Sequence, residues 1–140
     1  MARLSVPLQS TGTIHMNTQS QIAATIANAR SYLNAATQDL TEEQFNWLPP
    51  GATNTISAIF FHIASAEDFY IQRVIGGGAL LFASNGWPEN TGVTQVPGPR
   101  GGWDQFRAKP FAIAPIREYA AAVQARTDAY LAGSSDDELK

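Results

Sequence analysis

The segment from Asn54 to Ile75 constrains the fold of this chain more than any other part of the sequence. Its first half carries isoleucine, alanine or phenylalanine at positions 56, 58–61, 63 and 64, so a helix here is apolar on nearly every side. Such a helix is typically covered by protein on most sides. At ~1.5 Å per residue it has about the depth of a small domain, so the sequence predicts the central helix of a helical bundle.

His62 lies in the most apolar part of this segment. No second metal ligand shares its side of the helix, because Glu67 and Asp68 point in other directions at helical spacing. An imidazole in these surroundings is expected to be neutral and to need a partner on another segment, either a backbone carbonyl, a carboxylate or a metal ion. From residue types alone, the favoured interpretation is a core histidine that makes a hydrogen bond.

Two more long helices are predicted on either side of this one. Apolar residues recur at alternating spacings of four and three from about Asn17 to Gln38. Another helix is predicted from about Pro115 to Leu131, closed by Gly133. Its buried side is expected to comprise Ile116, Tyr119, Val123, Thr127 and Tyr130.

Capping signals mark the helix ends. Thr41 and Gln44 have the spacing of a capping box that begins a short turn, and Thr53 or Asn54 is the expected cap of the helix that carries His62. Phe45 and Trp47, which follow the capping box, are expected to pack into one end of the bundle.

The stretch from Gly76 to Pro110 has a different character, with eight of the 11 glycines and four of the eight prolines of the chain. So long a connection in a compact domain is usually an ordered functional loop or a lid. Short helical pieces are predicted at 79–83 and 103–107. Several side chains of the loop have two interpretations: Trp87, Trp103 and Phe106 either anchor the loop or line a pocket, and Arg100, Arg107 and Lys109 either bind an anionic group or are solvated.

Composition excludes several classes of function. The net charge of −3 and the scattered lysines and arginines give no support for binding to nucleic acid or to an anionic membrane. The absence of cysteine excludes disulfides, zinc-thiolate sites and a thiol nucleophile. The longest apolar run is far shorter than the ~20 residues that cross a bilayer. Residues 1–16 lack the features of a secretory signal, so a cytoplasmic protein is expected.

The chain is expected to consist of an N-terminal arm, residues 1–16, and one helical domain, residues 17–140. Ser134 to Leu139 repeats the capped-turn pattern that follows the first helix, yet no helix follows it in the sequence. This pattern predicts two helix–turn–helix halves, the second of them incomplete at its C-terminal end. Three helices would leave one flank of the helix that carries His62 uncovered, for a fourth helix or another chain to bury.

The order of these motifs resembles that of the DinB-like superfamily of metalloproteins. The resemblance covers the chain from about Asn17 to its end. It rests on the first predicted helix with Leu40–Phe45, on Thr55–Ala64 with Glu67, and on the later Gly86-Trp87, Gly102-Trp103 and Asp136–Leu139.

The resemblance implies an all-α fold, a four-helix bundle of which three long helices and the Gly/Pro-rich loop are present here. It also implies a homodimer, and a divalent metal, zinc or nickel, held by three histidines at one end of the bundle. His62 matches the first of these metal ligands. The other two belong to a fourth helix that this sequence does not contain, and His15 is in the wrong place to replace them.

Three functions are compatible with this interpretation. The leading hypothesis is that the complete protein is a metal-dependent enzyme acting on a small molecule. Its relatives include S-transferases and isomerases that use a thiol such as bacillithiol, mycothiol or glutathione. An open coordination position would activate a thiol, and the Gly/Pro-rich loop would cover it. The alternatives are a non-catalytic helical binding or dimerisation module, in which His62 is only a buried polar residue, and a metal-dependent hydrolase.

Overall fold

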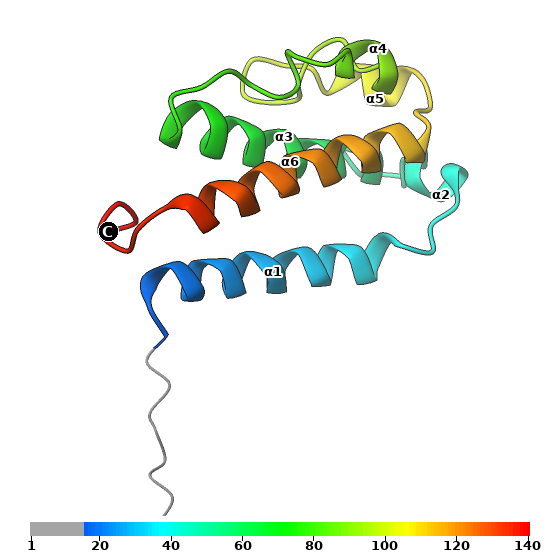
Figure 1. Ribbon diagram of the computed structural model, residues 1–140. Helices are drawn as coiled ribbons and strands as arrows, with labels where there is room; N and C mark the ends of the chain where they lie inside the picture. Colours follow the sequence, from blue (N-terminus) through cyan, green and yellow to red (C-terminus); the bar gives the residue numbers. More distant parts are fainter. Residues whose placement is uncertain (1–15) are drawn as a thin grey trace, which may run out of the picture.

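The computed structural model describes residues 16–140, and their regular secondary structure is helical apart from one isolated bridge between Gly98 and Gly101 (Figure 1). The predicted N-terminal arm therefore lies outside the described residues, except for Met16. The elements in chain order are α1 (Thr18–Thr37), α2 (Glu42–Asn46), α3 (Ile56–Glu67), η1 (Asp68–Ile75), α4 (Trp87–Thr91), α5 (Asp104–Ala108) and α6 (Ile113–Gly133).

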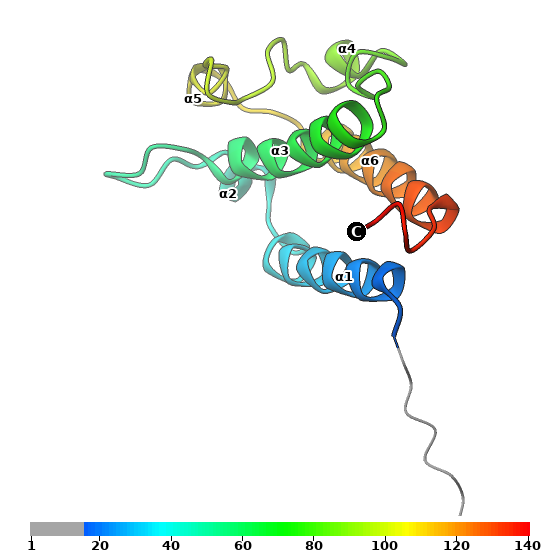
Figure 2. The same cartoon turned by 90° about the vertical axis from the view of Figure 1, so that its left-hand side faces the viewer.

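Three long helical segments form the body of the protein, as the sequence predicted. α6 packs along α3, and α1 runs beside α6 on the side away from the loop that carries α4 and α5 (Figures 1 and 2). Arg30 of α1 joins all three segments, because its guanidinium contacts Glu67 of α3 at 2.6 Å and Asp128 of α6 at 2.7 Å. The all-α prediction is confirmed.

The capping signals define the helix ends closely. Thr41 and Gln44 form the predicted capping box at the start of α2, since each side chain bonds to the backbone of the other residue. The cap of α3 is Thr55, one residue beyond the predicted pair, and its hydroxyl accepts the N–H of Ala58. The predicted 54–75 helix is continuous, but its last eight residues form a π-helix, η1, which Gly76 ends.

Aromatic side chains form most of the core between α3, α6 and the loop. Phe61 of α3 is fully buried and stacks on Tyr119 of α6, with ring centroids 5.2 Å apart. The predicted buried side of α6 is confirmed, except that Tyr130 is half-buried and Leu131 is buried in its place. The large, completely buried apolar side chains include Phe45, Phe61, Val93, Phe106, Ile116, Tyr119 and Val123.

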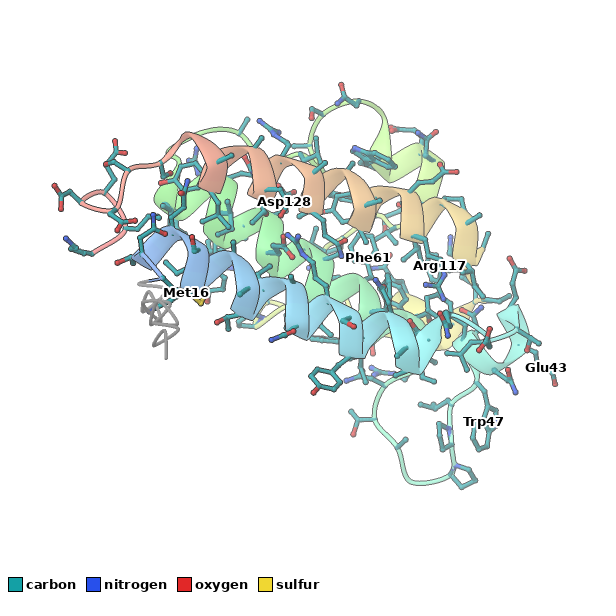
Figure 3. The ribbon with its side chains drawn as sticks, turned by 60° about the horizontal axis from the view of Figure 1, so that its bottom comes forward. Met16, Glu43, Trp47, Phe61, Arg117 and Asp128 are labelled. Atoms are coloured by element: carbon teal, nitrogen blue, oxygen red, sulfur yellow. The ribbon has the colours of Figure 1, made fainter. Side chains whose placement is uncertain are left out.

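One core prediction was wrong. Phe45 is fully buried as expected, but Trp47 is 59% exposed. α2 ends at Asn46, and the chain then leaves the bundle in an extended conformation towards the turn at Pro49, Pro50 and Gly51 (Figure 3). Trp47 moves out with this turn, so its apolar character alone did not place it in the core.

The Gly/Pro-rich loop covers one side of the α3–α6 pair (Figure 1). The predicted helical piece near Trp103 is present as α5, shifted by one residue, whereas α4 was not predicted. The helix predicted at 79–83 is absent. The reason is that the N–H groups of Leu81 and Phe82 both donate to the Asp68 carboxylate, a long-range interaction that replaces local helix bonds.

α3 has an apolar flank that its neighbours do not cover. Ile56, Ile59 and Ile63 follow one another along this flank and are 37%, 47% and 42% exposed. The flank borders a groove of about 360 Å³ between α3 and α1, whose other wall includes Ile26 and Leu33. The central helix is thus less covered than its composition predicted, and the expected open flank is present.

None of the helices in the described part of the chain combines the length and the apolar character needed to span a membrane.

Candidate functional site

His62 projects from α3 towards the loop and is half-buried there. Its Nδ1 lies 2.8 Å from the carbonyl oxygen of Pro97, and its ring packs against Trp103 with centroids 4.9 Å apart. The sequence predicted a partner on another segment and left its nature open. The structure shows that this partner is a backbone carbonyl.

This contact determines which ring nitrogen carries the proton. A carbonyl oxygen only accepts hydrogen bonds, so Nδ1 of His62 must donate to Pro97. The neutral ring then keeps its lone pair on Nε2. An N–H bonded to a backbone carbonyl is the arrangement that orients metal-ligating histidines, and it equally suits a histidine that accepts a proton from a ligand.

His62 lines a cavity of about 460 Å³ between α3, η1 and the loop. That volume is in the range of small-molecule sites. Its lining residues are His62, Ser65, Ala66, Asp68, Phe69, Tyr70, Leu80, Phe82, Val96, Pro97, Gly98, Pro99, Arg100 and Tyr119.

Asp68 and Tyr119 form a hydrogen-bonded pair at this cavity that the sequence interpretation missed. Asp68 is only 1% exposed, and its carboxylate accepts the N–H groups of Leu81 and Phe82 at 2.9 Å and the hydroxyl of Tyr119 at 3.0 Å. Burial raises the pKa of Tyr119 far above its ordinary value, and the negative charge of Asp68 raises it further, so the phenol keeps its proton. The available signal was an acidic residue directly after the apolar half of the helix.

The three loop cations have different surroundings. Arg107 bonds to Asp104 and to the carbonyl of Thr53, and Lys109 bonds to the carbonyl of Gly92. Arg100 lines the cavity, and within residues 16–140 its guanidinium has neither a hydrogen bond nor an ion pair.

The aromatic side chains of the loop are anchors. Phe106 is buried beside Phe61, and Trp87 packs against Tyr119 with centroids 5.5 Å apart. Trp103 packs on the His62 ring, and its indole N–H donates to Gly98. None of these three side chains lines the cavity beside His62. The structure therefore favours the interpretation that they anchor the loop over the interpretation that they line a pocket.

The described residues supply one candidate metal ligand at this site, His62, and not a complete set of ligands. His62 has the right donor atom and orientation, but no group of three His, Cys, Asp or Glu side chains gathers anywhere in the part of the chain that the structure describes. Asp68 uses its carboxylate for three hydrogen bonds, and Glu67 is paired with Arg30. His15 lies outside the described residues.

An all-α bundle in which a long loop packs over a histidine-bearing cavity defines the class of protein. A family model described as the DinB superfamily matches residues 25–140, and the chain belongs to that superfamily. The superfamily is generally associated with metals. No curated protein and no solved structure gives a significant match.

Proposed function

We propose that this protein is a DinB-superfamily metalloprotein in which Nε2 of His62 is one ligand of a divalent metal ion, zinc or nickel. The observation that carries the proposal is the hydrogen bond from Nδ1 to Pro97, which leaves the Nε2 lone pair available at a cavity of small-molecule size. Neutral imidazoles favour both metals. The remaining ligands are proposed to come from another segment of the protein or from a second copy of the chain, and not from His15.

The proposed reaction is conjugation of a thiol to a small molecule in the cavity beside His62. The thiol sulfur would form a bond to a carbon of that molecule, the leaving group on this carbon would depart with the bonding electron pair, and the thiol proton would go to solvent. When bound, the metal supplies a lowered pKa for a coordinated thiol. The chain's own residues position and enclose the reactants. Pro97 orients the imidazole, and Asp68 holds the loop over the cavity through Leu81 and Phe82. Apolar side chains such as Val96 reduce the access of water.

The metal site is tested by metal analysis with plasma emission on protein purified after growth with zinc or nickel. We expect bound metal in the wild-type protein and none in His62→Ala, with an unchanged circular dichroism spectrum. His15→Ala, which removes the other histidine of the chain, is the matched control and should keep its metal. Equal metal content in His62→Ala and wild type, or no metal in either, would contradict the proposal.

The reaction is tested on the metal-loaded protein with two probes. Conjugation of glutathione to chlorodinitrobenzene reports thiol transfer, and cleavage of nitrophenyl acetate reports hydrolysis by metal-bound water. We expect the first reaction to exceed its uncatalysed rate and to be lost in His62→Ala. Activity with nitrophenyl acetate alone would support the hydrolase in place of the S-transferase.

The exposed flank of α3 supports a second candidate, a non-catalytic helical module that forms dimers. Ile56, Ile59 and Ile63 present a continuous apolar stripe beside the groove, and an exposed stripe of this kind is typical of a contact surface. Sedimentation should then show a dimer that Ile59→Glu converts to a monomer. A dimer that binds no metal would favour this module over the enzyme, and a stable wild-type monomer would exclude it.

A further inference from the structure

The polar groups that line the cavity beside His62 are mostly bonded to one another. The Asp68 carboxylate already accepts three hydrogen bonds, one of them from Tyr119. The Ser65 hydroxyl donates to the carbonyl oxygen of His62 at 3.1 Å. Among the side chains that line the cavity in residues 16–140, three polar groups thus keep free bonding capacity: Nε2 of His62, the hydroxyl of Tyr70 and the guanidinium of Arg100. Of these three, the Arg100 guanidinium is the permanent cation.

The backbone that carries Arg100 is held in place. Gly98 and Gly101 close a tight turn around it, with N–H to carbonyl distances of 2.9 and 3.1 Å. The turn is attached to the bundle at two points, because His62 donates to the carbonyl of Pro97 and the Trp103 indole donates to the carbonyl of Gly98. The backbone of Arg100 is therefore fixed beside the cavity that this residue lines, while the residue itself is exposed.

The remaining lining is largely apolar. α3 and η1 contribute Ala66 and Phe69, and the loop contributes Leu80, Phe82 and Val96. Arg100 is the one cationic side chain in this lining, and Asp68 lines the same cavity. A ligand with one negative charge could pair with Arg100. A second negative charge on the ligand would find no further cation in this lining and would be repelled by the Asp68 carboxylate.

We propose that this cavity binds a small organic monocarboxylate with an apolar body. Arg100 pairs with the carboxylate, and the apolar walls bury the hydrocarbon part next to His62. The planar guanidinium matches a carboxylate with two parallel hydrogen bonds, which a lysine at this position would not provide. The inference rests on the proposed function in taking this cavity as the functional site, but the binding does not require a metal.

The test is a titration of the metal-free protein, followed by backbone amide chemical shifts. The two probes are phenylbutyrate and phenylbutanol, which share the apolar body and differ in the negative charge. We expect the wild-type protein to bind the carboxylate about tenfold more tightly than the alcohol, with the largest shifts between Val96 and Arg100. The preference should weaken at high salt, because an exposed ion pair is screened.

Four variants separate the outcomes. Arg100→Gln should lose the preference for the carboxylate, and Arg100→Lys should keep only part of it. Arg126→Gln makes the same change of charge at an exposed position on α6 outside the cavity, and should behave like the wild type. His62→Ala should keep the preference, so failure of the metal proposal does not affect this result. Equal affinities for the two probes, an unchanged preference in Arg100→Gln, or shifts confined to the α1–α3 groove would overturn the inference.

Discussion

Replacing Asp68 with asparagine should destabilise the protein strongly, although the two side chains have nearly the same shape. The carboxylate accepts hydrogen bonds at both oxygens: Leu81 donates to Oδ1, and Phe82 and Tyr119 donate to Oδ2. An asparagine amide has one oxygen and one NH2 group, so in either orientation the NH2 faces a buried backbone N–H. One donor loses its partner, and the surviving bonds lose their charge-assisted character.

The magnitude follows from these two losses. A buried donor without a partner costs about 1–3 kcal/mol, and a hydrogen bond to a charged group exceeds a neutral one by about 1 kcal/mol. Relief of the desolvation of a buried charge offsets part of this cost. We therefore expect Asp68→Asn to lower the free energy of unfolding by about 2–4 kcal/mol, a large share of the roughly 5–15 kcal/mol typical of a domain.

Urea unfolding followed by tryptophan fluorescence measures this change, and hydrogen exchange at the amides of Leu81 and Phe82 localises it. Asp128→Asn is the matched control, because Asp128 is 64% exposed and its ion pair with Arg30 contributes less than about 1 kcal/mol. If Asp68→Asn costs no more than this control, desolvation of the carboxylate cancels its hydrogen bonds, and the loop does not depend on Asp68.

Two further predictions concern the same region. Because the pKa of Tyr119 is raised in the folded state, its contribution to stability is complete below its ordinary pKa of about 10 and is lost as the pH rises above that value. The difference in unfolding free energy between wild type and Tyr119→Phe should therefore shrink from pH 9 towards about pH 12; a constant difference would contradict the shift. Gly102→Ala should lower the free energy of unfolding in urea by more than about 1 kcal/mol, because Gly102 has a φ of +87° and a Cβ there would lie 2.7 Å from the Val96 carbonyl oxygen. Gly133→Ala is the control and should not lower it by this much, because a Cβ at Gly133 meets nothing within 4 Å.

Local patterns in the sequence were enough to predict the long helices. The periodicity of apolar residues located α1 and α6 to within about two residues, and the Thr41–Gln44 capping box formed as predicted. These features depend on residues within one or two turns of each other, so the sequence of a short segment is enough to specify them. The same holds for His62: its apolar neighbours implied a partner on another segment, and such a partner exists.

The identity of that partner was not predictable in the same way. Pro97 is 35 residues away from His62, and only the folded loop brings its carbonyl to the imidazole. Asp68 appeared to point away from the site at ideal helical spacing, yet its carboxylate bonds to the loop and lines the cavity. No local signal marked the change from α-helix to π-helix at this residue.

The sequence by itself therefore determined the helical segments, the apolar character of α3 and the need of the His62 imidazole for a partner on another segment, because these depend on the periodicity of nearby side chains. Only the tertiary structure decided how the Gly/Pro-rich loop lies, which cation faces the cavity and which side chains are exposed, as for Trp47 and Arg100. The loop has no periodicity of its own, and its course depends on a few hydrogen bonds between residues far apart in the chain.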